Sequence, residues 1–156
     1  MARRQRIGSK DLGINPNSGR EKDLFRWFIA SYLFGKRIRQ ETARDTANVF
    51  FKSGLDSPAK LTKAGWQRLV NKLDEGRYTR YDESTARNLL EAARKLKDEY
   101  RGRISNVFSA SKNVTELKKR LQEFKGVGPK TVEIFMRDID DADSLIKGGT
   151  AKKKAA

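Results

Sequence analysis

A turn built on two glycines, set between two helical segments, constrains the fold of this chain more than any other stretch. Before the turn, apolar side chains recur at helical spacing at Leu117, Leu121 and Phe124. The turn reads Gly126-Val127-Gly128-Pro129. Its glycines can adopt backbone conformations closed to other residues, and its proline suits the first turn of a helix. A helical apolar stripe resumes over residues 132–136. The sequence therefore predicts a compact helical hairpin.

The second helix of this hairpin begins at a predicted anion site. The first N–H groups of a helix have no partner within it, and the helix dipole is positive at that end. Lys125 and Lys130 add two cations beside the turn. The residues expected to contact phosphate are Lys125, Gly126, Val127, Gly128, Lys130 and Thr131. The alternative is an ordinary helical hairpin with glycine at the bend and no ligand.

Positive charge is spread along the whole chain. The 156 residues carry a net charge of +15; residues 1–20 and residues 144–156 hold +4 each, and the residues between them keep +7. A basic folded region with basic ends is typical of a nucleic-acid binder. A surface charged for solubility, or one that binds membranes, is the alternative. The sequence predicts no strongly amphipathic basic helix of the kind that binds membrane surfaces.

Two residue types are missing, and their absence excludes several kinds of chemistry. The chain has no cysteine, so it has no disulfide, no thiolate metal site and no iron–sulfur cluster. It has no histidine, so Ser-His-Asp catalysis is excluded. No apolar run approaches the length of a membrane span, and residues 1–6 lack the apolar segment of a signal peptide. We expect a monomeric cytoplasmic protein without a membrane partner. Association with the nucleoid is compatible with this expectation.

Apolar periodicity predicts an all-α bundle of about seven helices, because no stretch shows the alternation of a β-strand. The expected helices cover residues 21–35, 40–52, 58–61, 65–73, 83–100, 113–124 and 129–139. Residues 1–20 are expected to form a flexible basic arm, residues 21–143 the helical domain, and residues 144–156 a lysine-rich disordered tail.

A loop at residues 74–82 alternates basic and aromatic side chains. Arg77 and Arg80 suit contacts to phosphate, and Tyr78 and Tyr81 could stack on bases. The alternative, which we favour for the tyrosines, is that they cover the core. Arg77 and Arg80 therefore join the expected DNA contacts.

The segment Gly126-Val127-Gly128-Pro129-Lys130-Thr131 resembles the helix-hairpin-helix motif of the DNA glycosylase superfamily to which endonuclease III belongs. The likeness is continuous from about Asp23 to Ile139. It implies a helical domain that holds the backbone of double-stranded DNA through the N–H groups of the hairpin. It also implies that hairpin carbonyls, here those of Gly126 and Gly128, hold a monovalent cation.

The resemblance also points to candidate catalytic residues. Bifunctional members of the family carry a lysine nucleophile where Lys130 stands, and an aspartate roughly eighteen positions later. That position is Gly148 in this chain. Nearby acids, such as Asp138, Asp140 and Asp141, come too early for that register. The cysteine cluster of endonuclease III is missing as well.

Three functions follow as hypotheses. The first is a DNA-binding protein that contacts the phosphate backbone without sequence specificity and without glycosylase activity. The second is a base-excision repair enzyme, either an abasic-site lyase using Lys130 or a glycosylase with one of the nearby acids displaced into the catalytic role. The third is a helical module that binds RNA or protein.

Overall fold

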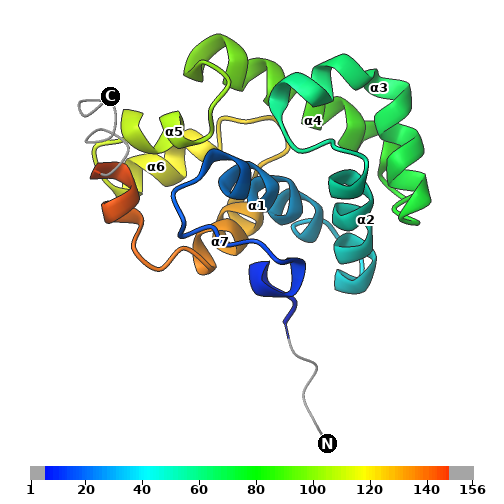
Figure 1. The fold of residues 1–156 in the computed structure, drawn as a ribbon, viewed down its shortest axis with the longest axis horizontal. Coiled ribbons are helices and arrows are strands. Elements are labelled where there is room, and N and C mark those ends of the chain that lie inside the picture. Colours follow the sequence, from blue (N-terminus) through cyan, green and yellow to red (C-terminus); the bar gives the residue numbers. More distant parts are fainter. Residues whose placement is uncertain (1–5, 148–156) are drawn as a thin grey trace, which may run out of the picture.

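The computed structural model describes residues 6–147, and over these residues the chain is helical with no strand (Figure 1). This confirms the predicted all-α fold. A short 3-10 helix, η1, comes first, and seven α-helices follow. Their bounds are η1 Ser9–Leu12, α1 Glu21–Phe34, α2 Gln40–Lys52, α3 Pro58–Glu75, α4 Asp82–Tyr100, α5 Ser105–Ala110, α6 Val114–Leu121 and α7 Pro129–Arg137. Residues 142–147 are helical too. The tail predicted at 144–156 lies outside the described residues from 148 onward.

Helix α1 lies at the centre of the molecule and packs against α2 and α7 (Figure 1). The sequence predicts one broad apolar face for it, yet the helix is enclosed nearly all round, from Leu24 to Leu33. Trp27 is fully buried, and its indole N–H donates to the carbonyl oxygen of Phe135 on α7 at 2.9 Å. The burial of so much apolar area in one helix makes α1 a large contributor to the hydrophobic stabilisation of the fold.

Aromatic side chains attach the predicted hairpin to this central helix. The ring of Phe28 lies edge-on to Phe124, at 5.6 Å between centroids, and to Phe135, at 6.1 Å. Phe124 comes just before the turn, and Phe135 lies on α7. Edge-to-face pairs are favoured by the ring quadrupoles, in addition to the area they bury. One residue of α1 therefore positions both sides of the hairpin.

Helix α3 covers the two shorter helices predicted at 58–61 and 65–73, and its two helical segments meet at a break in the backbone at Gly65. Its start is as expected: Ser57 accepts a hydrogen bond from the N–H of Lys60 at 3.2 Å, and Pro58 occupies the first turn. At Gly65 the backbone leaves helical geometry, with φ of 82°. The result is a kink within one long element that packs along α4.

Most of the predicted N-terminal arm packs against the domain. Ile14 and Pro16 are buried. The N–H of Ser9 donates to the carboxylate of Asp138 at 2.7 Å, and the Asn17 amide donates to the carbonyl of Asp138 at 3.0 Å. Residues 6–20 are therefore attached to the end of α7. Residues 1–5 of the predicted arm lie outside the described part of the chain.

Burial of two tyrosines makes the fold sensitive to alkaline pH. Burial raises the pKa of Tyr78 well above its ordinary value of 10.0, and it raises the pKa of Tyr32 as well. Above pH 10 the unfolded chain releases these phenol protons while the folded chain keeps them, so the free energy of unfolding falls as pH rises.

We predict that Tyr78→Phe makes this alkaline loss shallower, by up to about 1.4 kcal/mol per pH unit. Urea unfolding at a series of pH values from neutral to strongly alkaline measures both slopes. Identical slopes for the two proteins would show that Tyr78 ionises equally well in both states.

Candidate nucleic-acid interface

The hairpin consists of α6, the turn at residues 122–128 and α7. Helix α6 begins as predicted, because the side chain of Asn113 accepts a hydrogen bond from the N–H of Glu116 at 2.9 Å. The turn then reverses the chain through Gly126, whose φ of 81° is a left-handed conformation that favours glycine. Gly128 has an extended backbone, and α7 follows with Pro129 in its first turn.

Gly126 rests against two side chains of other helices. A Cβ at this position would overlap the Tyr32 hydroxyl of α1 and would lie 2.8 Å from the Asn88 amide nitrogen of α4. Asn88 in turn donates to the Tyr32 hydroxyl at 2.8 Å. A Cβ on Gly128, by contrast, would have no neighbour within 4 Å. The first glycine is thus required by the fold, whereas the second leaves the surface of the turn open.

The start of α7 offers backbone N–H groups to a ligand. Within residues 6–147, the N–H groups of Gly128 and Lys130 have no hydrogen-bond partner, and no side chain caps the helix. The end of α1 supports this turn from beneath: a Cβ on Gly35 would overlap the Thr131 hydroxyl and lie 3.3 Å from the Thr131 Cα. The position of these N–H groups is therefore fixed by tight packing.

The side chains predicted to bind phosphate fall into two groups. Lys125 and Lys130 are exposed, and neither ammonium group has an acidic partner among residues 6–147. Val127 and Thr131 are buried, so of these two residues only backbone groups could face a ligand. The hairpin thus presents two free cations and a set of backbone donors.

The loop before α4 reaches the same end of α1. Tyr78 is fully buried, and its hydroxyl donates to the carbonyl of Leu33 at 3.4 Å, so it belongs to the core as we favoured. Arg77 and Arg80 on either side of it are exposed. Arg80 lies over the ring of Tyr81, at 5.3 Å from the centroid. The structure therefore leaves both arginines exposed on either side of a tyrosine whose hydroxyl reaches the end of α1.

A lysine just beyond the end of α1 lies beside one of the carbonyls that the resemblance assigns to a monovalent cation. The ammonium group of Lys36 is 3.4 Å from the carbonyl oxygen of Gly126. The carbonyl of Gly128 accepts the first helical hydrogen bond of α7, from the N–H of Val132 at 3.1 Å. Each of the two expected carbonyl oxygens thus accepts a hydrogen bond within the chain, and the one on Gly126 already has a cationic group beside it.

The acidic candidates for catalysis lie far from Lys130. Asp138 ends α7, eight residues after Lys130, or roughly 12 Å along the axis. Its carboxylate accepts the hydrogen bond of Ser9 described above, and that of Asp140 accepts one from Asn17 at 3.3 Å. Asp141 accepts from the N–H of Ser144 at 3.1 Å. These carboxylates attach the N-terminal segment and the last helical turn rather than facing the hairpin.

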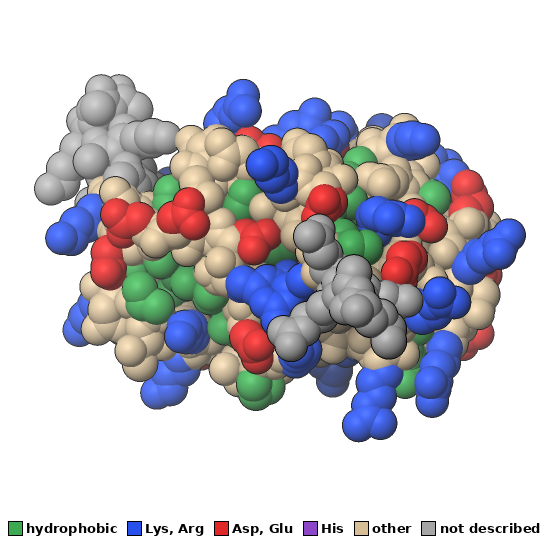
Figure 2. Space-filling view, turned by 90° about the horizontal axis from the view of Figure 1, so that it is seen from below, with side chains coloured by type: hydrophobic (Ala, Val, Ile, Leu, Met, Phe, Trp, Pro, Cys, Tyr) green, Lys and Arg blue, Asp and Glu red, His purple; other side chains and the backbone are tan. Residues whose placement is uncertain are grey.

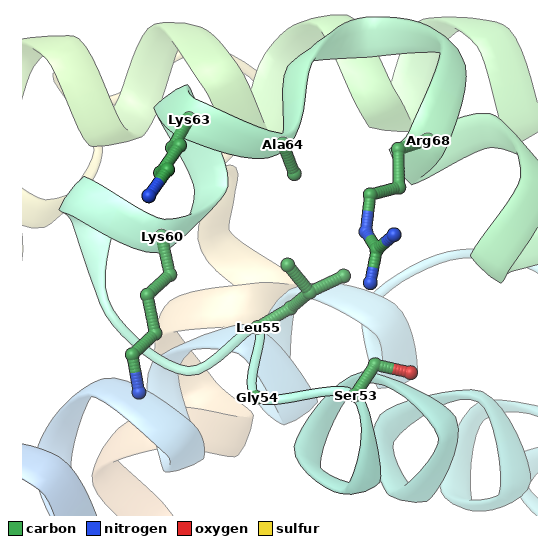
Figure 3. Close-up of a pocket in the computed structure, with 7 residues that line it drawn as sticks. All are labelled: Ser53, Gly54, Leu55, Lys60, Lys63, Ala64 and Arg68. Carbon is green, nitrogen blue, oxygen red and sulfur yellow. The ribbon is translucent and has the colours of Figure 1, made fainter.

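A second basic feature, which sequence reasoning missed, lies at the kink of α3. Its pocket of about 440 Å³ is lined by Ser53, Gly54, Leu55, Lys60, Lys63, Ala64 and Arg68 (Figure 3). The three cationic side chains surround Leu55 from both sides of the kink. The only sequence signal is a run of basic residues around Gly65, and the spacing across the kink cannot be read from it.

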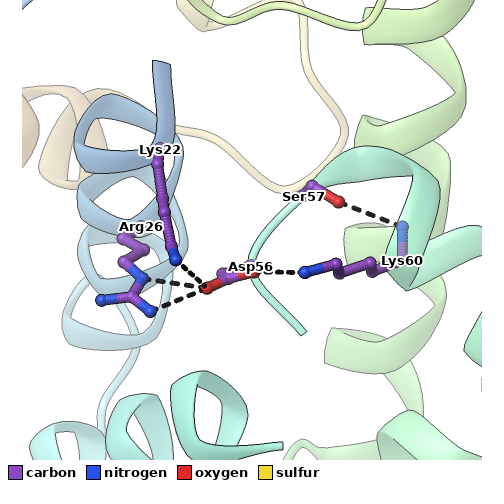
Figure 4. A network of polar contacts seen from close by, with 5 residues as sticks. All are labelled: Lys22, Arg26, Asp56, Ser57 and Lys60. Atoms are coloured by element: carbon purple, nitrogen blue, oxygen red, sulfur yellow. Dashed lines mark hydrogen bonds and ion pairs between the residues drawn. The ribbon is translucent and has the colours of Figure 1, made fainter. Parts of the chain in front are cut away.

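A buried aspartate holds this region to α1. Asp56 is 4% exposed and accepts hydrogen bonds from Arg26 at 2.8 and 3.1 Å (Figure 4). Lys60 lies 3.5 Å and Lys22 3.9 Å from the same carboxylate. Burial by itself would raise the pKa of Asp56, but the hydrogen bonds and charges of these three cations lower it below its ordinary value of 3.8. Lys60 is therefore partly neutralised, whereas Lys63 and Arg68 have no acidic partner among the described residues.

Charge alone does not place an interface on the surface. Figure 2 shows a face on which Lys and Arg side chains are scattered among acidic ones, with an apolar area between them. The hairpin is distinguished instead by the combination of free backbone donors and unpaired cations. In the described residues no group of three or more acidic side chains could hold a metal ion.

Comparison of the chain with protein-family models, curated proteins and solved structures gave no match. Among residues 6–147, no helix has both the length and the apolar character needed to cross a membrane.

Proposed function

We propose that this chain binds DNA by its phosphate backbone, without sequence preference, through the hairpin around Gly126. One observation carries the proposal: two backbone N–H groups without partners lie at the start of α7, beside two exposed lysines without acidic partners. Helix N-termini and lysines both bind phosphate in many proteins. Arg77 and Arg80, exposed in the loop before α4, are further cations that could contact the backbone.

The number and spread of cationic side chains favour a polymer of phosphates over a single phosphate group as the ligand. The net charge of +15 is more than one phosphate could neutralise, and the basic pocket at α3 adds further cations away from the hairpin. A nucleic-acid backbone supplies regularly spaced phosphates, and its binding releases counterions. Contacts from backbone N–H groups and lysines to phosphate carry no sequence information, so we expect binding through the hairpin to lack sequence preference.

Fluorescence anisotropy with the full chain tests this function. A labelled DNA duplex and an RNA duplex of the same length would be titrated at equal salt. We expect DNA to bind with micromolar affinity or tighter at low salt. Stronger binding to RNA would favour the RNA-binding hypothesis, since a reader of the 2′-hydroxyl discriminates the two. No binding to either duplex would rule the proposal out.

The lyase is the second candidate, because Lys130 is exposed at the turn. Such an enzyme forms a Schiff base with the sugar of an abasic site, and borohydride reduces it to a stable adduct. We predict that the chain forms no adduct on an abasic duplex, since the acids that might assist lie at the other end of α7. A covalent adduct that persists in Lys125→Ala and disappears in Lys130→Ala would establish the lyase instead.

A further inference from the structure

Lys36 lies at the centre of the contacts that shape the hairpin turn. It follows Gly35, where α1 ends, and its ammonium group reaches across to the carbonyl oxygen of Gly126, 3.4 Å away. The same ammonium lies over the ring of Tyr32, at 4.8 Å from the centroid. Ninety positions separate Lys36 from Gly126 in the sequence, so their contact is a product of the fold.

The surroundings of Lys36 are those of a bound cation. A carbonyl oxygen and the face of an aromatic ring are both attractive to positive charge. Lys36 is half-buried, and burial lowers its pKa with no carboxylate acting on it. The Tyr32 hydroxyl, fixed by Asn88, packs against Gly126 and so holds the carbonyl in place. The ammonium group thus has a built position against the turn.

We propose that the ammonium group of Lys36 serves as the cation of the hairpin, so that the phosphate-binding turn needs no bound potassium or sodium ion. A positive charge on the carbonyl side orients the peptide groups of the turn and reinforces the N–H groups that face the phosphate. This inference rests on the proposed DNA binding for its main readout. It makes a separate claim about the free chain: the turn is stable without an alkali metal ion.

The experiment compares Lys36→Ala with Lys95→Ala. Lys95 is a matched control, because its ammonium lies over the ring of Phe124, 5.6 Å from the centroid, but hydrogen-bonds to Glu99 rather than to the turn. Affinity for a DNA duplex would be measured in potassium chloride and in tetramethylammonium chloride at equal ionic strength. The tetramethylammonium ion carries its charge behind methyl groups, so it cannot coordinate the Gly126 carbonyl oxygen directly as a potassium ion can.

We expect the wild-type chain and Lys95→Ala each to bind equally well in the two salts, within about twofold. In tetramethylammonium chloride, Lys36→Ala should bind the duplex roughly tenfold more weakly than Lys95→Ala does. In potassium chloride, the affinity of Lys36→Ala should be at least about threefold higher than in tetramethylammonium chloride. The proposal is overturned if the wild-type chain itself needs potassium, if the two variants bind alike, or if potassium does not restore Lys36→Ala.

Thermal unfolding without DNA separates this inference from the proposed function. Lys36→Ala should melt at a lower temperature in tetramethylammonium than in potassium, while the wild-type chain and Lys95→Ala melt alike in both. If no protein binds DNA but this pattern is found, the proposed function fails and the internal cation stands. If DNA binds but neither readout of Lys36→Ala depends on the salt, the internal cation fails alone.

Discussion

Replacing Gly126 by alanine is expected to lower the free energy of unfolding by about 3 kcal/mol. Two effects add. The left-handed φ of 81° costs a residue with a Cβ about 1–2 kcal/mol. The new methyl group would also overlap the Tyr32 hydroxyl and press on the Asn88 amide, both of which are held by packing. Thermal unfolding should show a midpoint roughly 10 °C below that of the wild-type chain.

Gly128→Ala is the matched control for this prediction. Its backbone is extended, with φ of −106°, and a Cβ there would point into open space. We expect this variant to melt within a few degrees of the wild-type chain. A Gly126→Ala protein that melts as the control does would mean that the turn is not held against Tyr32.

Gly128→Ala also tests where phosphate binds on the hairpin. If phosphate approaches the N–H of Gly128, a methyl group at this position lies in its path. Gly128→Ala should therefore weaken DNA binding while leaving stability nearly unchanged. A variant with unchanged affinity would place the phosphate elsewhere on the hairpin.

Removing both free cations of the hairpin is expected to weaken DNA binding about 30-fold at low salt. The change is the double substitution Lys125→Ala with Lys130→Ala. Each lysine that neutralises a phosphate contributes about one released counterion, so the log–log dependence of affinity on salt should become shallower by about 2. Anisotropy titrations over a salt series measure both quantities.

The control for this variant removes two exposed lysines elsewhere, Lys52 on α2 and Lys97 on α4. It changes the net charge by the same amount. We expect its affinity to fall only a few-fold, through the weaker long-range field. Equal losses in the two double variants would show that binding depends on overall charge rather than on the hairpin.

The helical core could be predicted because its signals are local. Helix α4 follows a clear apolar period, and the starts of α3 and α6 carry side chains that cap them, at Ser57 and Asn113. Helix α5 was missed because it is only six residues long and rich in serine and asparagine, which favour turns. The break at Gly65 could be predicted, because a glycine between two apolar helical segments signals a change in backbone conformation.

The site was only partly predictable, because its supporting contacts join distant parts of the chain. The turn, its two lysines and its glycines are contiguous and could be recognised. The attachment of residues 6–20 could not, since Ser9 and its acceptor Asp138 are 129 positions apart. The role of Lys36 was hidden for the same reason: nothing near it in the sequence points to Gly126.

The most direct test is to measure how the affinity of the wild-type chain for an undamaged duplex changes with salt. Binding to phosphates releases counterions, so it weakens as salt rises. The titration would run from about 50 to about 200 mM salt. With about five phosphates neutralised, the log of the binding constant should fall against the log of salt with a slope of about −4 to −5. A slope near zero, or no binding at the lowest salt, would contradict the account.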